Sequence, residues 1–107
     1  VNIMSAIRVV AIITAKPGQR DAVLEIARAN IPAVLAEEGC IEYAPTVDAE
    51  GMGGFQTQFG PDTFVFVEQW GSVDNLKAHA ASEHMKAYGA KTKEMIESRV
   101  IHVLSDV

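Results

Sequence analysis

Residues 6–15 read A-I-R-V-V-A-I-I-T-A, an almost unbroken run of β-branched and small residues that predicts a β-strand. Successive side chains of a strand point to opposite faces, and here both faces are largely apolar. One face carries Ile7, Val9, Ala11 and Ile13, and the other carries Arg8, Val10, Ile12 and Thr14. A strand with two apolar faces needs cover on both sides, so we expect it in the middle of a sheet rather than open to water.

Three later segments also have strand-like patterns, at residues 40–48, 63–70 and 99–104. Pro45 lies within the second strand and indicates a bulge or a place at the edge of the sheet. The glycine-rich connection before the third strand contains residues 55–59, whose alternation suits a short strand or the tip of a hairpin arm. A connection this long in so small a domain is usually functional or lies between subunits.

Helical periodicity fills the intervals after the first and the third strands. The first helix covers about residues 19–39, with Gly39 as a left-handed cap and with a kink or a new start at Pro32. The second interval holds two helices. Ser72 suits the N-cap of a short helix, and residues 82–97 form a second helix that also begins at a serine.

The order β-α-β-β-α-β is that of a ferredoxin-like α+β sandwich. Right-handed crossovers place the two helical regions on one face of a four-stranded antiparallel sheet. We expect one domain over residues 5–107, preceded by an N-terminal extension at residues 1–4. Nothing within the chain covers the other sheet face, although 49% of the residues are hydrophobic. We therefore predict a homodimer that packs sheet against sheet.

Charge and composition argue against several kinds of partner. Lysine and arginine number 9 against 14 aspartates and glutamates, a net charge of -5, so we expect no binding to nucleic acid. Cys40 is the only cysteine, which excludes an intrachain disulfide and favours a cytoplasmic protein. No apolar stretch approaches the roughly 20 residues that a membrane-spanning helix needs, so we expect no membrane insertion.

Three segments together resemble a known family. They read E-E-G-C-I-E-Y-A-P at 37–45, E-Q-W-x-S-x-x-x-L-x-A-H at 68–79 and H-M-K-A-Y at 84–88. Along essentially the whole chain the sequence resembles the antibiotic biosynthesis monooxygenase family, and within it the small bacterial quinol monooxygenases. The resemblance implies a dimeric α+β barrel that oxidises a quinol or hydroxylated aromatic with molecular oxygen, without flavin, haem or metal. Haem-degrading relatives carry an asparagine in the first strand, and this strand has none.

Such chemistry chiefly needs a base and a dry aromatic pocket, because deprotonation makes a quinol a better electron donor to dioxygen. His79 is our candidate for the catalytic base. It lies about 60° around its helix from Leu76, at the border of the apolar face, and from there it can reach a cavity between helix and sheet. The alternative is a surface histidine. His84 is a second candidate for substrate binding, or else a hydrogen-bonded residue at the start of its helix.

Aromatic residues are the other candidates for substrate binding. Phe64, Phe66 and Trp70 share one strand face and suit the flat wall of a pocket for a planar ring, although the two phenylalanines suit the core equally well. Tyr43 and Tyr88 can direct hydroxyl groups toward a substrate oxygen. No pair of histidines has the spacing with a carboxylate that a zinc site needs, so we expect no metal, and the family resemblance implies that no cofactor is needed.

Two other functions remain open from the sequence, because one fold serves many activities. The first is an isomerase of a small oxygenated metabolite. The second is a non-catalytic dimeric protein that binds a small aromatic compound. Consumption of dioxygen with a quinol distinguishes the monooxygenase from both.

Overall fold

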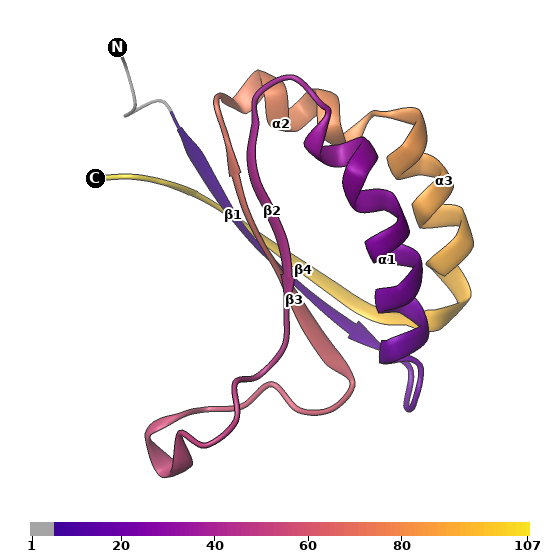
Figure 1. The fold of residues 1–107 in the computed structure, drawn as a ribbon, viewed down its shortest axis with the longest axis vertical. Helices are drawn as coiled ribbons and strands as arrows, with labels where there is room; N and C mark the ends of the chain where they lie inside the picture. Colours follow the sequence, from indigo (N-terminus) through magenta and orange to yellow (C-terminus); the bar gives the residue numbers. More distant parts are fainter. Residues whose placement is uncertain (1–5) are drawn as a thin grey trace.

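The computed structural model describes residues 6–107, so the extension expected at residues 1–4 lies outside the described residues. The elements are β1 (Ile7–Ala15), α1 (Arg20–Leu35), β2 (Cys40–Thr46), η2 (Gly53–Phe55), β3 (Thr63–Trp70), α2 (Val73–Ala80), α3 (Glu83–Thr92), η3 (Lys93–Met95) and β4 (Ile96–Ser105). The strands form one antiparallel sheet in the order β2-β3-β1-β4, and the α-helices lie on one side of it (Figure 1). This is the predicted ferredoxin-like α+β architecture.

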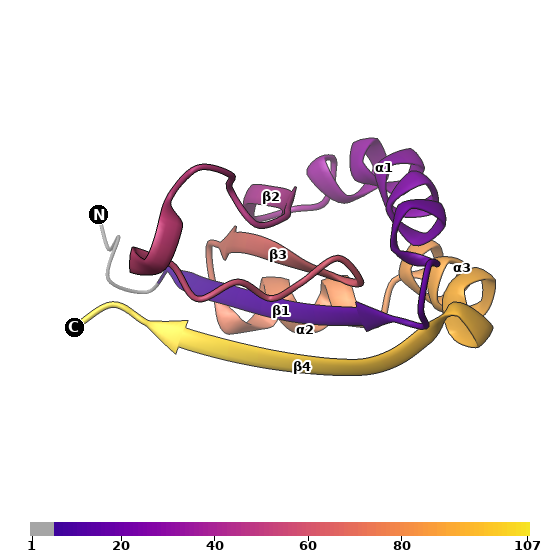
Figure 2. The ribbon, with the colours of Figure 1, turned by 90° about the horizontal axis from the view of Figure 1, so that it is seen from below.

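β1 lies in the interior of the sheet, between β3 and β4, as its two apolar faces predict (Figure 2). The face toward the helices is buried, and Val9 and Ile13 on it pack with Phe64 and Val23 in the hydrophobic core. The opposite face is only partly covered, because no helix of residues 6–107 crosses it (Figure 1). On that face Val67, Val100 and Leu104 are exposed.

α1 is one continuous helix through Pro32, so the new start predicted there is not found. Its cap residue is Ala36, which makes the prediction of Gly39 as the helix cap wrong. The helix ends earlier because the N–H of Glu37 bonds the carbonyl of Val34, which tightens the last turn. The chain then turns into β2 through Gly39, whose φ of 80° lies in the left-handed region.

The turn at Gly39 is held against the start of α2. The N–H of Gly71 donates to the carbonyl of Gly39 at 2.8 Å. A Cβ at Gly39 would collide with the side chain of Asn75 in the first turn of α2. Only glycine therefore allows the end of α1 to approach α2 this closely, and Glu37 lies within this turn.

Both predicted serine caps are confirmed. The Ser72 hydroxyl accepts a hydrogen bond from the Asn75 N–H at 3.1 Å, and the Ser82 hydroxyl accepts one from the Met85 N–H at 3.3 Å. The predicted end of the second helix at residue 97 is wrong, because α3 ends at Thr92 and β4 begins at Ile96. Pairing of β4 with the end of β1 outweighs the helical pattern of these residues.

The connection between β2 and β3 forms an arm that projects from the sheet (Figure 1). β2 ends at Thr46 rather than at residue 48. Residues 55–59 form no strand, which leaves the other expected form, a part of the arm near its tip. Their alternation finds no neighbouring strand to pair with, and η2 occupies the tip instead. The carboxylate of Asp48 closes the arm by accepting the N–H groups of Phe59 and Gly60, each at 2.9 Å.

β2 is an edge strand, as Pro45 predicts, although its register shift lies between Cys40 and Glu42 rather than at the proline. Within residues 6–107, none of the helices has the length and apolar character that crossing a bilayer requires.

Candidate active site

His79 lies in the last turn of α2 and is only 5% exposed, so the alternative of a surface histidine is excluded. The Ser72 cap starts α2 directly after β3, and this short connection sets His79 against the end of the sheet. Its ring packs at 4.6 Å from the Trp70 ring and at 5.4 Å from the Tyr43 ring, measured between centroids. Two aromatic side chains therefore hold the imidazole in place.

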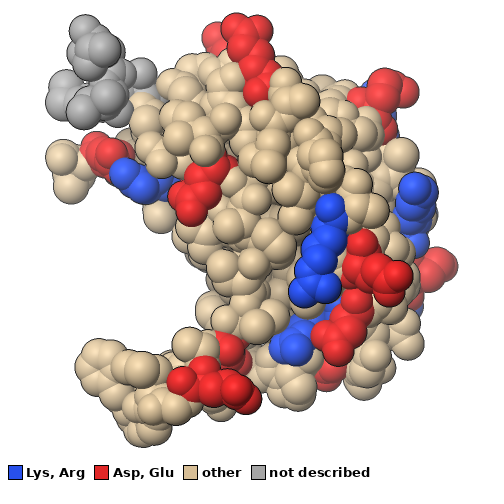
Figure 3. Space-filling model, in the orientation of Figure 1, with Lys and Arg blue, Asp and Glu red and all other residues tan. Residues whose placement is uncertain are grey.

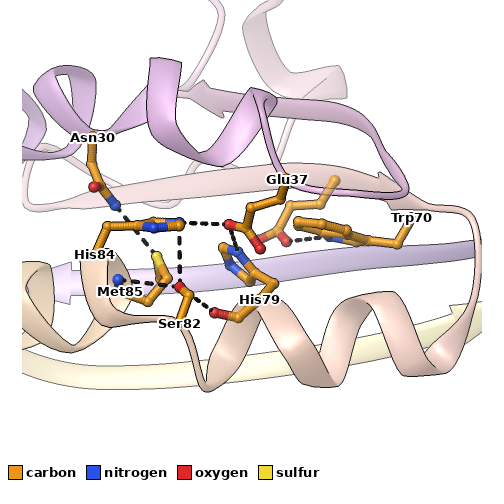
Figure 4. A network of polar contacts seen from close by, with 8 residues as sticks. Asn30, Glu37, Trp70, His79, Ser82, His84 and Met85 are labelled. Atoms are coloured by element: carbon orange, nitrogen blue, oxygen red, sulfur yellow. Dashed lines mark hydrogen bonds and ion pairs between the residues drawn. The ribbon is translucent and has the colours of Figure 1, made fainter.

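Glu37 fixes the orientation of this imidazole. Its Oε2 lies 2.8 Å from Nδ1 of His79, and the carboxylate reaches His79 from the turn after α1 (Figure 4). An ionised carboxylate only accepts hydrogen bonds, so Nδ1 is the protonated nitrogen. Within residues 6–107, Nε2 of His79 makes no side-chain hydrogen bond, and no buried side-chain nitrogen or oxygen lacks a partner. The unprotonated Nε2 is therefore left open to the cavity that His79 lines.

His84 is part of the same polar cluster but lies outside this cavity. Its Nε2 is 2.7 Å from Oε2 of Glu37 and 3.2 Å from the hydroxyl of Ser82, which itself donates to the carbonyl of His79 at 2.8 Å (Figure 4). His84 also borders a separate groove of about 600 Å³ between α1 and α3. The structure thus gives His84 the hydrogen-bonded position at the start of its helix, the alternative to substrate contact.

A cavity of about 390 Å³ lies between the sheet and helices α2 and α3. Its lining is mostly apolar and comes from Val9, Ala11, Ile13, Tyr43, Phe66, Glu68, Leu76, His79, Ala80, Met85, Tyr88, Gly89, Arg99 and Ile101. On the outer surface seen in the orientation of Figure 1, charged side chains gather around the helices and toward the ends of the sheet, and few lie at the centre of the view (Figure 3). The volume is in the range of small-molecule sites, and the polar groups are few.

The predicted aromatic wall is only partly correct. Phe66 and Tyr43 line the cavity and stack on each other, with centroids 4.5 Å apart and planes at 24°. Phe64 is fully buried behind Phe66 in the core, the alternative for this residue. Trp70 is also fully buried and supports His79 instead of lining the cavity. Tyr88 lines the cavity from α3, as predicted.

Burial controls the ionisation of the polar groups in the cavity. It raises the pKa of Glu68, while the indole N–H of Trp70, which donates to Glu68 at 2.9 Å, opposes this effect. Burial also raises the pKa of Tyr43 and of Tyr88. Both phenol groups therefore stay neutral near pH 7 and can donate hydrogen bonds to a bound ligand.

Comparison with known proteins assigns the chain to a family. The model of the antibiotic biosynthesis monooxygenase family matches residues 6–91. The chain belongs to the antibiotic biosynthesis monooxygenase family. It is 43% identical over 98 residues to the probable quinol monooxygenase YgiN of Escherichia coli K12, which covers 90% of this chain and 93% of the relative. The protein of the same name from Shigella flexneri matches equally well.

Solved structures share the fold of this antibiotic biosynthesis monooxygenase domain. PA3566 from Pseudomonas aeruginosa is 24% identical with a TM-score of 0.80, covering 98% of this chain and 97% of its own. A conserved protein from Methanosarcina mazei is 27% identical with a TM-score of 0.80, covering 96% and 94%. Rv0793 from Mycobacterium tuberculosis is 26% identical with a TM-score of 0.78, covering 96% of each chain. These likenesses extend along nearly the whole chain.

The sequence reasoning did not single out Glu37 and Arg99, of which Glu37 contacts His79 and Arg99 lines the cavity. Glu37 lies 42 positions before His79, and only its place in the E-E-G-C segment of the family resemblance drew attention to it. Arg99 is the one charged residue among positions 99, 101, 103 and 105, which alternate on one face of β4. Arg99 is itself exposed, so the signal is its position beside apolar neighbours and not a buried charge.

Glu37, His79 and His84 also form a group that could hold a metal ion, since one ligand atom of each lies within 4.8 Å of the others. The two nitrogen-to-oxygen distances of 2.8 and 2.7 Å are hydrogen-bond distances. Ligands of a tetrahedral zinc ion, at about 2.0–2.2 Å from the metal, lie roughly 3.3 Å apart. Both imidazoles would therefore have to move away from Glu37 and carry their proton on the other ring nitrogen. The arrangement fits two hydrogen bonds better than an ion.

Proposed function

We propose that the protein is a quinol monooxygenase that needs no flavin, haem or metal and that uses His79 as its base. The observation that carries the proposal is the hydrogen bond from His79 Nδ1 to Glu37, which leaves Nε2 as an acceptor at an apolar cavity. Family membership and the 43% identity to a probable quinol monooxygenase support the same reaction class. Substrate and oxidant are then a quinol or hydroxylated aromatic compound and dioxygen.

The first step is removal of a phenolic proton by Nε2 of His79, with Glu37 stabilising the imidazolium that forms. The quinolate donates one electron to dioxygen, and the resulting semiquinone and superoxide combine at a ring carbon. Loss of water from the hydroperoxide leaves a hydroxylated quinone. The balance is quinol plus O₂ giving hydroxyquinone plus H₂O. All four electrons that reduce dioxygen come from the quinol, two from its conversion to a quinone and two from hydroxylation of the ring, so no external reductant is needed.

The side chains around Nε2 suit these steps. Phe66 and Tyr43 offer a stacked aromatic surface on which a planar ring can lie. The neutral hydroxyls of Tyr43 and Tyr88 can donate hydrogen bonds to the oxygen that gains negative charge. Trp70 does not touch the ring in this proposal but keeps the imidazole in position. The apolar lining limits water, which favours transfer of the hydroperoxide oxygen over its release.

Oxygen uptake by the purified protein with chemically reduced naphthoquinol tests the proposal. The wild type should consume dioxygen well above the rate of autoxidation in buffer, and the product should gain one oxygen atom from ¹⁸O₂. His79→Ala should lose about 10²–10⁴-fold in rate, the usual contribution of a general base. Lys77→Ala is the control, because Lys77 is an exposed residue of the same helix, α2. Uptake by the wild type that equals the buffer rate would exclude the monooxygenase.

The isomerase and the non-catalytic binding protein give other results in the same assay. Neither consumes dioxygen with a quinol, and the binding protein produces no new compound. Neither alternative has a specific observation in its favour.

We also propose that the protein works as a homodimer that packs through the sheet face opposite the helices. Val67, Val100 and Leu104 are exposed on this face, which no helix of residues 6–107 covers. Light scattering at micromolar concentration should give twice the 11.5 kDa chain mass, and Leu104→Lys should shift it toward one chain. A wild-type mass of one chain would contradict the dimer. We also propose a cytoplasmic location for the protein, with which its single cysteine is consistent.

A further inference from the structure

Arg99 is a charged side chain of the cavity that has no part in the chemistry above. It lies on β4 and lines the cavity beside Tyr88, Gly89 and Ile101. Among residues 6–107 its guanidinium enters none of the ion pairs or side-chain hydrogen bonds. A guanidinium binds carboxylates through two parallel hydrogen bonds, so an unpaired one beside an apolar cavity can receive an anion from a ligand.

Arg99 and His79 lie at opposite ends of the cavity. Arg99 pairs with Ile13 across the sheet. His79 packs on Tyr43. Tyr43 pairs with Glu68 on β3, and Glu68 pairs in turn with Val9 on β1. Val9 and Ile13 are four residues apart on β1, which corresponds to about 13 Å at roughly 3.4 Å per residue. An aromatic ring held at His79 would therefore direct its far side toward Arg99.

The charges along the cavity define one orientation for an acidic ligand. Glu68 pairs with Tyr43 across strands β2 and β3 at the His79 end of the cavity, and its carboxylate would repel an anion placed there. At the other end, the positive charge of Arg99 acts on the Tyr88 hydroxyl, where it opposes the rise in the pKa of Tyr88 caused by burial. An anion thus meets repulsion at one end, and at the other a guanidinium and a phenol that can both donate hydrogen bonds.

We propose that the cavity selects aromatic quinols that carry a carboxylate on the side of the ring away from the reacting hydroxyl, and that Arg99 binds this carboxylate. The inference deepens the proposed monooxygenase function and rests on it. Arg99 acts on substrate choice rather than on the chemical step, because it lies too far from Nε2 of His79 to reach the proton that is transferred.

Two matched substrates test this role, namely 1,4-dihydroxynaphthalene with a carboxymethyl group on its second ring and the primary amide of that compound. The wild type should have a kcat/KM about tenfold higher for the acid, through KM, as one charge-assisted hydrogen-bonded contact gives. Arg99→Gln should abolish this ratio without changing kcat, and Arg99→Lys should keep part of it. Lys91→Gln, which removes a lysine bordering the groove between α1 and α3, is the control. An unchanged ratio in Arg99→Gln would overturn the proposal.

A binding measurement separates this inference from the proposed reaction. Trp70 is the only tryptophan and packs on His79, so its fluorescence should be quenched by the corresponding oxidised quinone acid and quinone amide. The Kd ratio of acid to amide should favour the acid about tenfold in the wild type and be close to one in Arg99→Gln. If no quinol is oxidised but this ratio holds, the reaction is wrong and the Arg99 site stands. A ratio near one in the wild type refutes the Arg99 site.

Discussion

Glu37→Gln tests whether a carboxylate sets the protonation of the catalytic base. The substitution keeps the size and shape of the side chain and removes its charge. Oε2 of Glu37 accepts two N–H groups, from Nδ1 of His79 at 2.8 Å and from Nε2 of His84 at 2.7 Å. Both bonds end on the same oxygen, so a glutamine that places its carbonyl oxygen there can still accept both N–H groups, whereas the flipped amide presents its NH₂ group to both imidazoles.

The expected loss follows from which amide atom takes the place of Oε2. If the NH₂ group faces Nδ1 of His79, the proton of that ring moves to Nε2, and the nitrogen at the cavity can no longer accept a proton. An incorrect tautomer of this kind lowers kcat by about 10⁴-fold in a serine protease triad. Because the glutamine can also take the opposite orientation, we expect a smaller fall in kcat of about 10²-fold, with little change in KM. The lost charge-assisted bonds should also cost about 1–3 kcal/mol of unfolding free energy.

The assay combines oxygen uptake with ¹⁵N NMR of the histidine side chains at a temperature where the variant is folded. The NMR spectrum reports the tautomer of His79 directly, and a purely structural effect would leave it unchanged. Glu38→Gln is the matched control, since Glu38 is the exposed neighbour of Glu37 and loses the same charge. If Glu37→Gln kept full kcat, the proposed role of Glu37 would be refuted. If it lost activity while Nδ1 of His79 stayed protonated, Glu37 would act through its charge on the imidazolium, and its role in setting the tautomer would be refuted.

Three further predictions concern stability. Gly39→Ala should cost about 2 kcal/mol or more and lower Tm by about 10 °C, because φ is positive there and the methyl group meets Asn75; an unchanged Tm would contradict this geometry. Two backbone N–H groups lower the pKa of Asp48 in the folded state. The stability that this carboxylate contributes is therefore present above its unfolded-state pKa and is lost as pH falls through the lower folded-state pKa. Asp48→Asn should lower Tm at pH 7 and match the wild type near about pH 2. Trp70→Phe leaves buried Glu68 without its donor and should cost about 1–3 kcal/mol. Loss of the indole N–H donor further raises the folded-state pKa of Glu68, so protonation of Glu68 stabilises the folded variant. The difference in stability between the variant and the wild type should therefore shrink as pH falls.

Most of the fold could be predicted because its signals are local. The two apolar faces of β1 placed it in the sheet interior, and the period change after Trp70 marked the passage from β3 to α2. Ser72 and Ser82 marked both helix starts, since an N-cap is a contact within four residues of the chain. The place of His79 on the border of a helix face was also enough to make it a candidate.

The errors lie where distant contacts outweigh local pattern. Residues 93–97 continue a helical pattern, but pairing of Ile96 with Ala15 turns the chain into β4. Residues 55–59 alternate like a strand, but no neighbouring strand is available to pair with them. Trp70 was predicted to line the pocket because it shares a strand face with Phe66. Its complete burial against His79 depends on how α2 packs on the sheet, which the sequence pattern does not reveal. Glu37 could not be found from spacing, because it meets His79 only after α1 and α2 have packed.

The turn after α1 joins the stability of the fold to the proposed chemistry. Gly39 allows the close approach to Asn75, and Glu37, two residues earlier in the same turn, thereby reaches His79. A side chain at position 39 would displace the turn, and a shift of even 1 Å would break a hydrogen bond of 2.8 Å. Gly39→Ala should therefore lose a larger factor in kcat than its fraction of unfolded protein explains. Activity that merely followed the folded fraction would mean that Glu37 is not needed to orient the base.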